Sequence, residues 1–182
     1  MFDPAAFFKT KRFLLVSGCI ALPLAAFLST GGFGQLPVVA EKTMDPLFCY
    51  PPAIIHDYLD AQGQNGRAAY LVLHIVDYFF LLCFYPFLSS LLYRLNRTCT
   101  IRGPFSYSFV LPLAAGLFDL TENLFIDLLI LLYPARIGLP ASIASFSTCA
   151  KFSLLYSTFV MLLLFFAKWI FSSIRKNKRI AP

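Results

Sequence analysis

Residues 111–134 read LPLAAGLFDLTENLFIDLLILLYP, and this stretch decides the fold of the chain. It is long and apolar enough to cross a bilayer as a helix, since a crossing needs about 20 predominantly apolar residues. It nevertheless contains three acidic residues, Asp119, Glu122 and Asp127, and the amide Asn123. An ionised side chain at the centre of a membrane helix costs about 2.5–3.5 kcal/mol on insertion scales. These polar side chains therefore have to face other helices or a water-filled cavity.

The composition of the whole chain points to the same environment. Of its 182 residues, 59% are hydrophobic and only 13% are charged. Soluble domains have about 45–50% apolar and roughly 25% charged residues. The composition excludes a soluble enzyme, a disordered tail and a disulfide-rich secreted domain, and we expect a single membrane domain over residues 1–182.

Three further apolar runs accompany the quoted stretch, and together they predict an all-α, integral membrane four-helix bundle. The runs lack period-two alternation and are too long for the strands of a membrane barrel, which leaves helices as the spanning structure. The predicted spans cover about residues 12–30, 68–93, 107–132 and 141–169. In the first long loop, AIIHDYLDA over residues 53–61 predicts a short amphipathic helix at the membrane interface. Gly63 and Gly66 are expected to turn the chain into the second span.

Basic residues are concentrated at one end of the predicted spans, and they predict the orientation. Loops on the cytoplasmic side of a membrane have an excess of Lys and Arg. Both termini are therefore expected to face the cytoplasm or the matrix of an organelle, in a bacterial inner membrane or an organelle inner membrane. The bases on that side are Lys9, Lys11, Arg12, Arg94, Arg97, Arg102, Lys168, Arg175, Lys176, Lys178 and Arg179, and those on the other side are Lys42, Arg67 and Arg136.

The same bases predict contact with lipid and not with nucleic acid. The net charge of +6 comes from residues that flank apolar runs, where a basic rim attracts anionic head groups. The expected partners are membrane lipids and other membrane protein subunits. The candidates for head-group contact are Arg94, Arg97, Arg102, Lys168, Arg175 and Lys176.

Ionisable residues fall at matching depths of three predicted spans. With a rise of 1.5 Å per residue, Asp77, Glu122 and Lys151 lie at one level, roughly 14 Å from the end opposite the termini. We expect Lys151 to pair with Glu122 or Asp77, His74 to bond to a carboxylate, and Asn123 to bridge the helices. The predicted polar network consists of Tyr70, His74, Asp77, Asp119, Glu122, Asn123, Asp127, Thr148 and Lys151.

The cysteines and histidines predict no metal site. The five cysteines form no CxxC pair, and two histidines cannot make a three-histidine zinc site. Cys19, Cys83 and Cys149 lie within apolar runs, where cysteine behaves as a small hydrophobic residue. We expect no metal and no cofactor other than a bound phospholipid.

Four short motifs give the chain a recognisable pattern over residues 45–166. They are a Gly-Arg-x-x-Tyr segment, an Asp on the second helix, Asp-x-x-Glu-Asn on the third and Thr-x-x-Lys on the fourth. With these motifs the chain resembles an uncharacterised family of small four-helix membrane proteins. The resemblance implies the fold and brings no chemistry with it. The matching residues are Gly66, Arg67, Tyr70, Asp77, Asp119, Glu122, Asn123, Thr148 and Lys151.

Two classes of function remain open from the sequence. In the first, the protein is an accessory or scaffold subunit of a larger membrane complex, and the polar network fixes helix packing. In the alternative, it is an intramembrane enzyme or a lipid- or proton-handling protein that uses the Asp, Glu, Asn and Lys side chains. The chain has neither a GxSxG nor an HExxH motif, and the LFDL around Asp119 is not the glycine-rich motif of diaspartyl proteases. Candidate catalytic residues would be Asp77, Asp119, Glu122 and Lys151.

Overall fold

The computed structural model describes residues 10–29 and 48–180, with the side chains of 27–29 and 176–180 left out. Within these residues the chain is all-α, with four α-helices, one short 3-10 helix and no strand, as predicted. The elements are α2 (Lys11–Ser29), α3 (Pro52–Thr98), η1 (Pro104–Tyr107), α4 (Val110–Leu131) and α5 (Gly138–Ile180).

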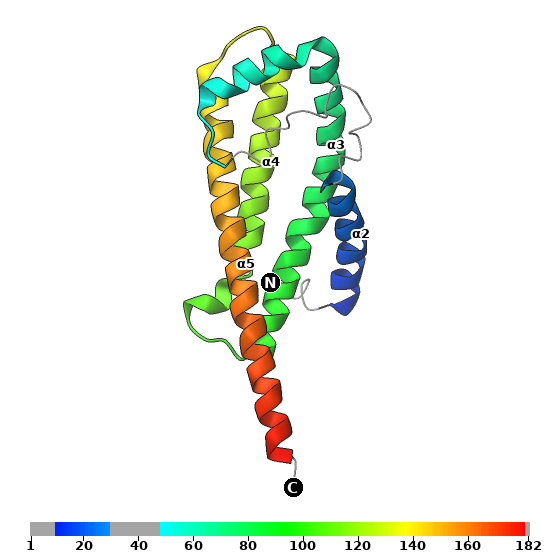
Figure 1. Ribbon diagram of the computed structural model, residues 1–182, viewed down its shortest axis with the longest axis vertical. Coiled ribbons are helices and arrows are strands. Elements are labelled where there is room, and N and C mark those ends of the chain that lie inside the picture. Colours follow the sequence, from blue (N-terminus) through cyan, green and yellow to red (C-terminus); the bar gives the residue numbers. More distant parts are fainter. Residues whose placement is uncertain (1–9, 30–47, 181–182) are drawn as a thin grey trace, which may run out of the picture.

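Helices α3, α4 and α5 pack against one another, and α2 packs mainly against α3 on the outside (Figure 1). Helix α4 runs antiparallel to α3 and to α5, and the last part of α5 extends well past the other helices (Figure 1). The core of the described chain is therefore built by three helices, with α2 as an addition to one side.

Helix α3 has a sharp bend near its beginning. Gly63 has φ of 61° and ψ of −177°, which glycine adopts without the steric cost that a Cβ atom brings. The segment before this bend crosses the end of the bundle, and the segment after it runs along the bundle (Figure 1). The helix expected over residues 53–61 is therefore present as the first part of α3, and Gly63 is the turn into the longer part.

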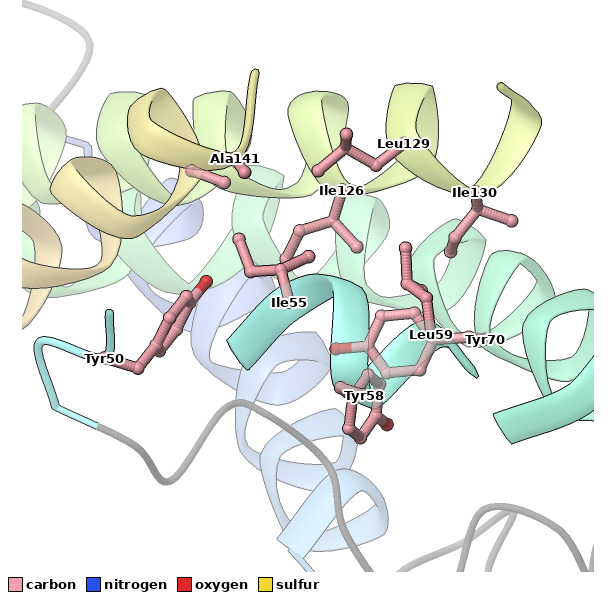
Figure 2. Close-up of a cluster of buried hydrophobic side chains, with 10 residues drawn as sticks. Tyr50, Ile55, Tyr58, Leu59, Tyr70, Ile126, Leu129, Ile130 and Ala141 are labelled. Carbon is pink, nitrogen blue, oxygen red and sulfur yellow. The ribbon is translucent and has the colours of Figure 1, made fainter. Parts of the chain in front are cut away.

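The apolar face of this first segment packs on protein. Ile55, Tyr58 and Leu59 are buried in one cluster with residues of α4 and α5 (Figure 2). Ile54 is exposed. The ends of α4 and α5 cover the three buried residues, and the position of this helix at the membrane interface stays a prediction. The cluster consists of Tyr50, Ile55, Tyr58, Leu59, Tyr70, Ile126, Leu129, Ile130, Ala141 and Ala144.

Side-chain hydrogen bonds fix the turn that joins α3 to α4. The Asn96 amide donates to the Ser106 carbonyl at 2.6 Å, and the Ser89 hydroxyl donates to the Phe109 carbonyl, also at 2.6 Å. Both carbonyls belong to the connection between the helices or to the N-cap of α4. The two bonds therefore tie the second half of α3 to this connection.

Two of the described helices are long and apolar enough to cross a membrane. They are α3 and the part of α5 over Gly138–Arg175. Helix α4 has 22 mostly apolar residues, but its three acidic residues, Asp119, Glu122 and Asp127, set it apart from these two helices. Helices α3 and α5 both run past the predicted span ends, where Arg, Leu and Lys, which have good helix propensity, continue the helix.

Candidate functional site

Polar side chains of α3 and α4 meet in pairs along the interface of the two helices. Asp127 accepts a hydrogen bond from the Tyr78 hydroxyl at 2.5 Å and lies 2.5 Å from Nδ1 of His74. The Asn123 amide donates to Asp77 at 2.5 Å. His74 meets Asp127 near one end of the interface and Tyr85 meets Asp119 further along it, as expected for antiparallel helices. The pairs thus hold the two helices in one register.

Lys151 of α5 joins two carboxylates of α4. Its Nζ lies 2.8 Å from Oδ1 of Asp119 and 2.7 Å from Oε2 of Glu122. The second oxygen of Asp119 accepts a hydrogen bond from the Tyr85 hydroxyl of α3 at 2.6 Å. Lys151, Asp119 and Glu122 are only 6%, 7% and 1% exposed. A buried ion pair is tolerated when the remaining oxygens also have hydrogen-bond donors, and this cluster supplies them.

Tyr50 reaches the same cluster from the loop before α3. It is 4% exposed, and its hydroxyl donates to Oε1 of Glu122 at 3.3 Å. The Thr148 hydroxyl lies 3.0 Å from the hydroxyl oxygen of Tyr50, and the Ser145 hydroxyl donates to the backbone carbonyl of Tyr50. Burial first, and the neighbouring Glu122 next, raise the pKa of Tyr50 above its usual range, so the phenol stays protonated and donates.

A disulfide lies next to Tyr50 in the sequence. Cys49 is bonded to Cys149 of α5, across 100 residues. The expectation that Cys149 serves only as a small hydrophobic residue is therefore wrong. A disulfide between distant segments has no local signal unless the spacing belongs to a known framework.

The structure brings the predicted network residues of the three helices together. Lys151 pairs with Glu122, one of the two partners expected for it, and also with Asp119. His74 meets the carboxylate of Asp127, and its ring lies 4.5 Å from the ring of Tyr70, centroid to centroid.

Three tyrosines of the site are absent from the predicted network: Tyr50, Tyr78 and Tyr85. Within apolar runs tyrosine resembles other aromatic residues, although its hydroxyl needs a partner when it is buried. The spacing contained one usable signal, since Tyr78 follows His74 by four residues and shares its helix face. Tyr50 had no such signal, because it belongs to a loop.

The candidate head-group residues lie at the end of the bundle away from the disulfide. Arg94 and Arg97 line one hollow together with Tyr93 and Thr98. Arg102, Lys168 and Arg175 are exposed, and the side chain of Lys176 lies outside the described part of the chain.

Protein side chains enclose the carboxylates of this cluster. Glu122 is almost completely buried and is contacted by Lys151 and Tyr50. A groove of about 530 Å³ between α3 and α4 is lined by Tyr78 and Tyr85, but its lining includes neither Glu122 nor Lys151. Among the described residues, no three His, Cys, Asp or Glu side chains are grouped to hold a metal ion.

No family model, curated protein or solved structure matches the chain. Membership in the small four-helix membrane family therefore remains a prediction from the motifs.

Gly116 provides a test of the contact between α3 and α4. A Cβ atom at this position would lie 2.7 Å from Cδ2 and 2.8 Å from Cγ of Tyr85. Gly116→Ala should push the Tyr85 ring away and weaken its hydrogen bond to Asp119. We expect the free energy of unfolding to fall by about 1–3 kcal/mol, which is typical of an overpacked core. The measurement is thermal unfolding of the purified protein in detergent. Gly138→Ala is the control, because a Cβ there meets nothing within 4 Å. Equal stability of the two variants would contradict the contact.

Proposed function

We propose that this chain is a small integral membrane protein that serves as an accessory or scaffold subunit of a larger membrane protein complex. The observation that supports this role best is the pairing in the polar network. Lys151 is paired with Asp119 and Glu122, and tyrosine, histidine or amide donors contact the carboxylates as well. Such bonds between helices are a source of stability inside a bilayer, where packing alone has no hydrophobic driving force.

The outer surface supports insertion into a membrane. Leu82, Leu117, Leu131 and Leu163 are 64–73% exposed, and they belong to α3, α4 and α5. Soluble monomers rarely expose contiguous apolar patches larger than a few hundred Å². Lipid or partner subunits would cover these faces.

The positions of the basic residues and of the disulfide both support an orientation in which the termini lie on the cytoplasmic or matrix side. The basic residues Arg94, Arg97 and Arg102 are at the end of α3 and in the turn after it, whereas Cys49 precedes α3 at the opposite end. Loops rich in Lys and Arg stay on the cytoplasmic side, and disulfides persist in oxidising compartments such as the periplasm. We therefore propose that both termini face the cytoplasm or an organelle matrix and that the disulfide lies toward the other side.

The end of α5 supports a role in assembly. It extends beyond the other helices and exposes Phe166, Trp169, Phe171 and Ile174 (Figure 1). These side chains spread over more than half of the helix circumference, so the end of α5 offers apolar area to a partner helix as well as to lipid. The alternative use of Asp77, Asp119, Glu122 and Lys151 in catalysis has less support, because the catalytic group would first have to leave its partners.

Purification from native membranes tests the scaffold role. A tagged full-length chain, extracted in a mild detergent, should migrate on a native gel in a stoichiometric complex with other membrane proteins. Asp119→Asn should lower the amount of this complex, because it weakens the bond to Lys151, while the exposed Ser153→Ala should leave it unchanged. Recovery of the wild-type chain alone, with only lipid bound, would overturn the proposal.

A further inference from the structure

An apolar groove lies between the second half of α3 and the second half of α5. It has a volume of about 480 Å³ and is lined only by apolar side chains. Its wall on α5 runs from Phe159 to Trp169, which is about 15 Å along a helix and half of the roughly 30 Å hydrocarbon core. The groove therefore has the length that one leaflet offers to an acyl chain. Its lining residues are Leu91, Leu95, Phe159, Leu162, Leu163, Phe166 and Trp169.

A separate basic hollow of about 260 Å³ lies at the same end of α3 and is lined by Tyr93, Arg94, Arg97 and Thr98. Leu91, Leu95 and Thr98 follow one another at helical steps of four and three, so they share a face of α3. The first two line the groove, and Thr98 lines the hollow together with Arg94 and Arg97. The thiol of Cys99 donates to the carbonyl of Phe165 at 3.4 Å, which brings the end of α3 against α5 beside the groove.

The charge around the hollow favours an anion. The sequence contains no acidic residue between Asp77 and Asp119 and none after Asp127, whereas Arg94, Arg97 and Arg102 lie in the first of these intervals. Two arginines at the end of the helix that also forms a wall of the apolar groove match a ligand with a phosphate at one end and a hydrocarbon chain at the other. Trp169 lies near the outer end of the groove, and its indole ring suits the boundary between head groups and chains.

We propose that the groove and the hollow form one specific site for an anionic glycerophospholipid of the leaflet that faces the termini. Its phosphate binds to Arg94 and Arg97, and one acyl chain lies along α3 and α5. The proposal rests on the proposed membrane insertion, which can be measured separately. This site differs from a general attraction of lipid to a basic rim, because it requires Arg94 and Arg97 and does not require the other basic residues on that side.

Native mass spectrometry of the full-length protein in detergent tests the site. The protein is titrated with phosphatidylglycerol and, in parallel, with phosphatidylcholine of the same chains. We expect one phosphatidylglycerol to bind with higher affinity than phosphatidylcholine. The double variant Arg94→Gln with Arg97→Gln should lower the affinity for phosphatidylglycerol by about 25-fold. Each base near an anionic lipid surface contributes a factor of roughly five to the affinity. Leu163→Trp, which fills the groove, should lower the affinity for both lipids.

The control removes the same charge elsewhere on the same side. Arg102→Gln with Arg175→Gln should leave phosphatidylglycerol affinity within about twofold of the original, because both side chains are exposed outside the hollow. An equal loss in the two double variants, or equal affinity for both lipids in the original chain, would overturn the site. Release of the chain from membranes by alkaline carbonate would overturn the proposed function instead. Helical circular dichroism and a single gel-filtration peak show that each variant is folded.

Discussion

Lys151→Met is expected to prevent most of the protein from reaching its folded form. Methionine keeps the apolar stem of the side chain but removes the cation that lies 2.8 Å from Asp119 and 2.7 Å from Glu122. Two carboxylates, each at most 7% exposed, would then remain without a counter-charge in the core. Breaking a buried pair by removal of one partner costs about 3–5 kcal/mol, which is comparable to the stability of many domains.

The measurement is the yield of monodisperse protein after extraction, followed by thermal unfolding of what is recovered. Adding Asp119→Asn and Glu122→Gln to Lys151→Met should restore part of the yield, because the uncompensated charge is removed together with its partner. Lys168→Met is the matched control, since that side chain is exposed on the same helix. A Lys151→Met protein as stable as the original would show that the cluster does not hold α4 to α5.

Removing the disulfide should produce the second large loss of stability. The bond ties the segment before α3 to α5 and holds Tyr50 beside Glu122, Thr148 and Ser145. Cys49→Ser with Cys149→Ser should lower the free energy of unfolding by about 2–4 kcal/mol, which is typical for loss of a native disulfide. Thermal unfolding with and without reductant provides the measurement, and the original chain should shift toward the variant when it is reduced.

Cys83→Ser is the control for this experiment, because Cys83 is a free, half-buried cysteine of α3. It should have little effect and should keep its response to reductant. Insensitivity of the original chain to reductant would contradict a stabilising bond between Cys49 and Cys149.

Much of the fold was predictable from local patterns. Apolar runs of the right length predicted the four helices, and Gly63 predicted the bend in α3 through its conformational freedom. Lys151, Glu122 and His74 were predictable members of the site because ionisable residues in apolar helices are too costly to face lipid. The regular rise of a helix placed Asp77, Glu122 and Lys151 at one level on their separate segments.

The all-α class, the helix positions and the polar residues that need partners follow from the local sequence, since they depend on neighbours a few positions apart. The partners of these residues follow from the way the helices and the loop pack. This packing placed Tyr50 beside Glu122, joined Cys49 to Cys149 and buried Ile55 and Leu59 under α4 and α5. These contacts depend on the path of a loop and on the register of helices far apart in the chain. Tyrosine and cysteine suit apolar and polar surroundings alike, so their own identity does not specify the contact.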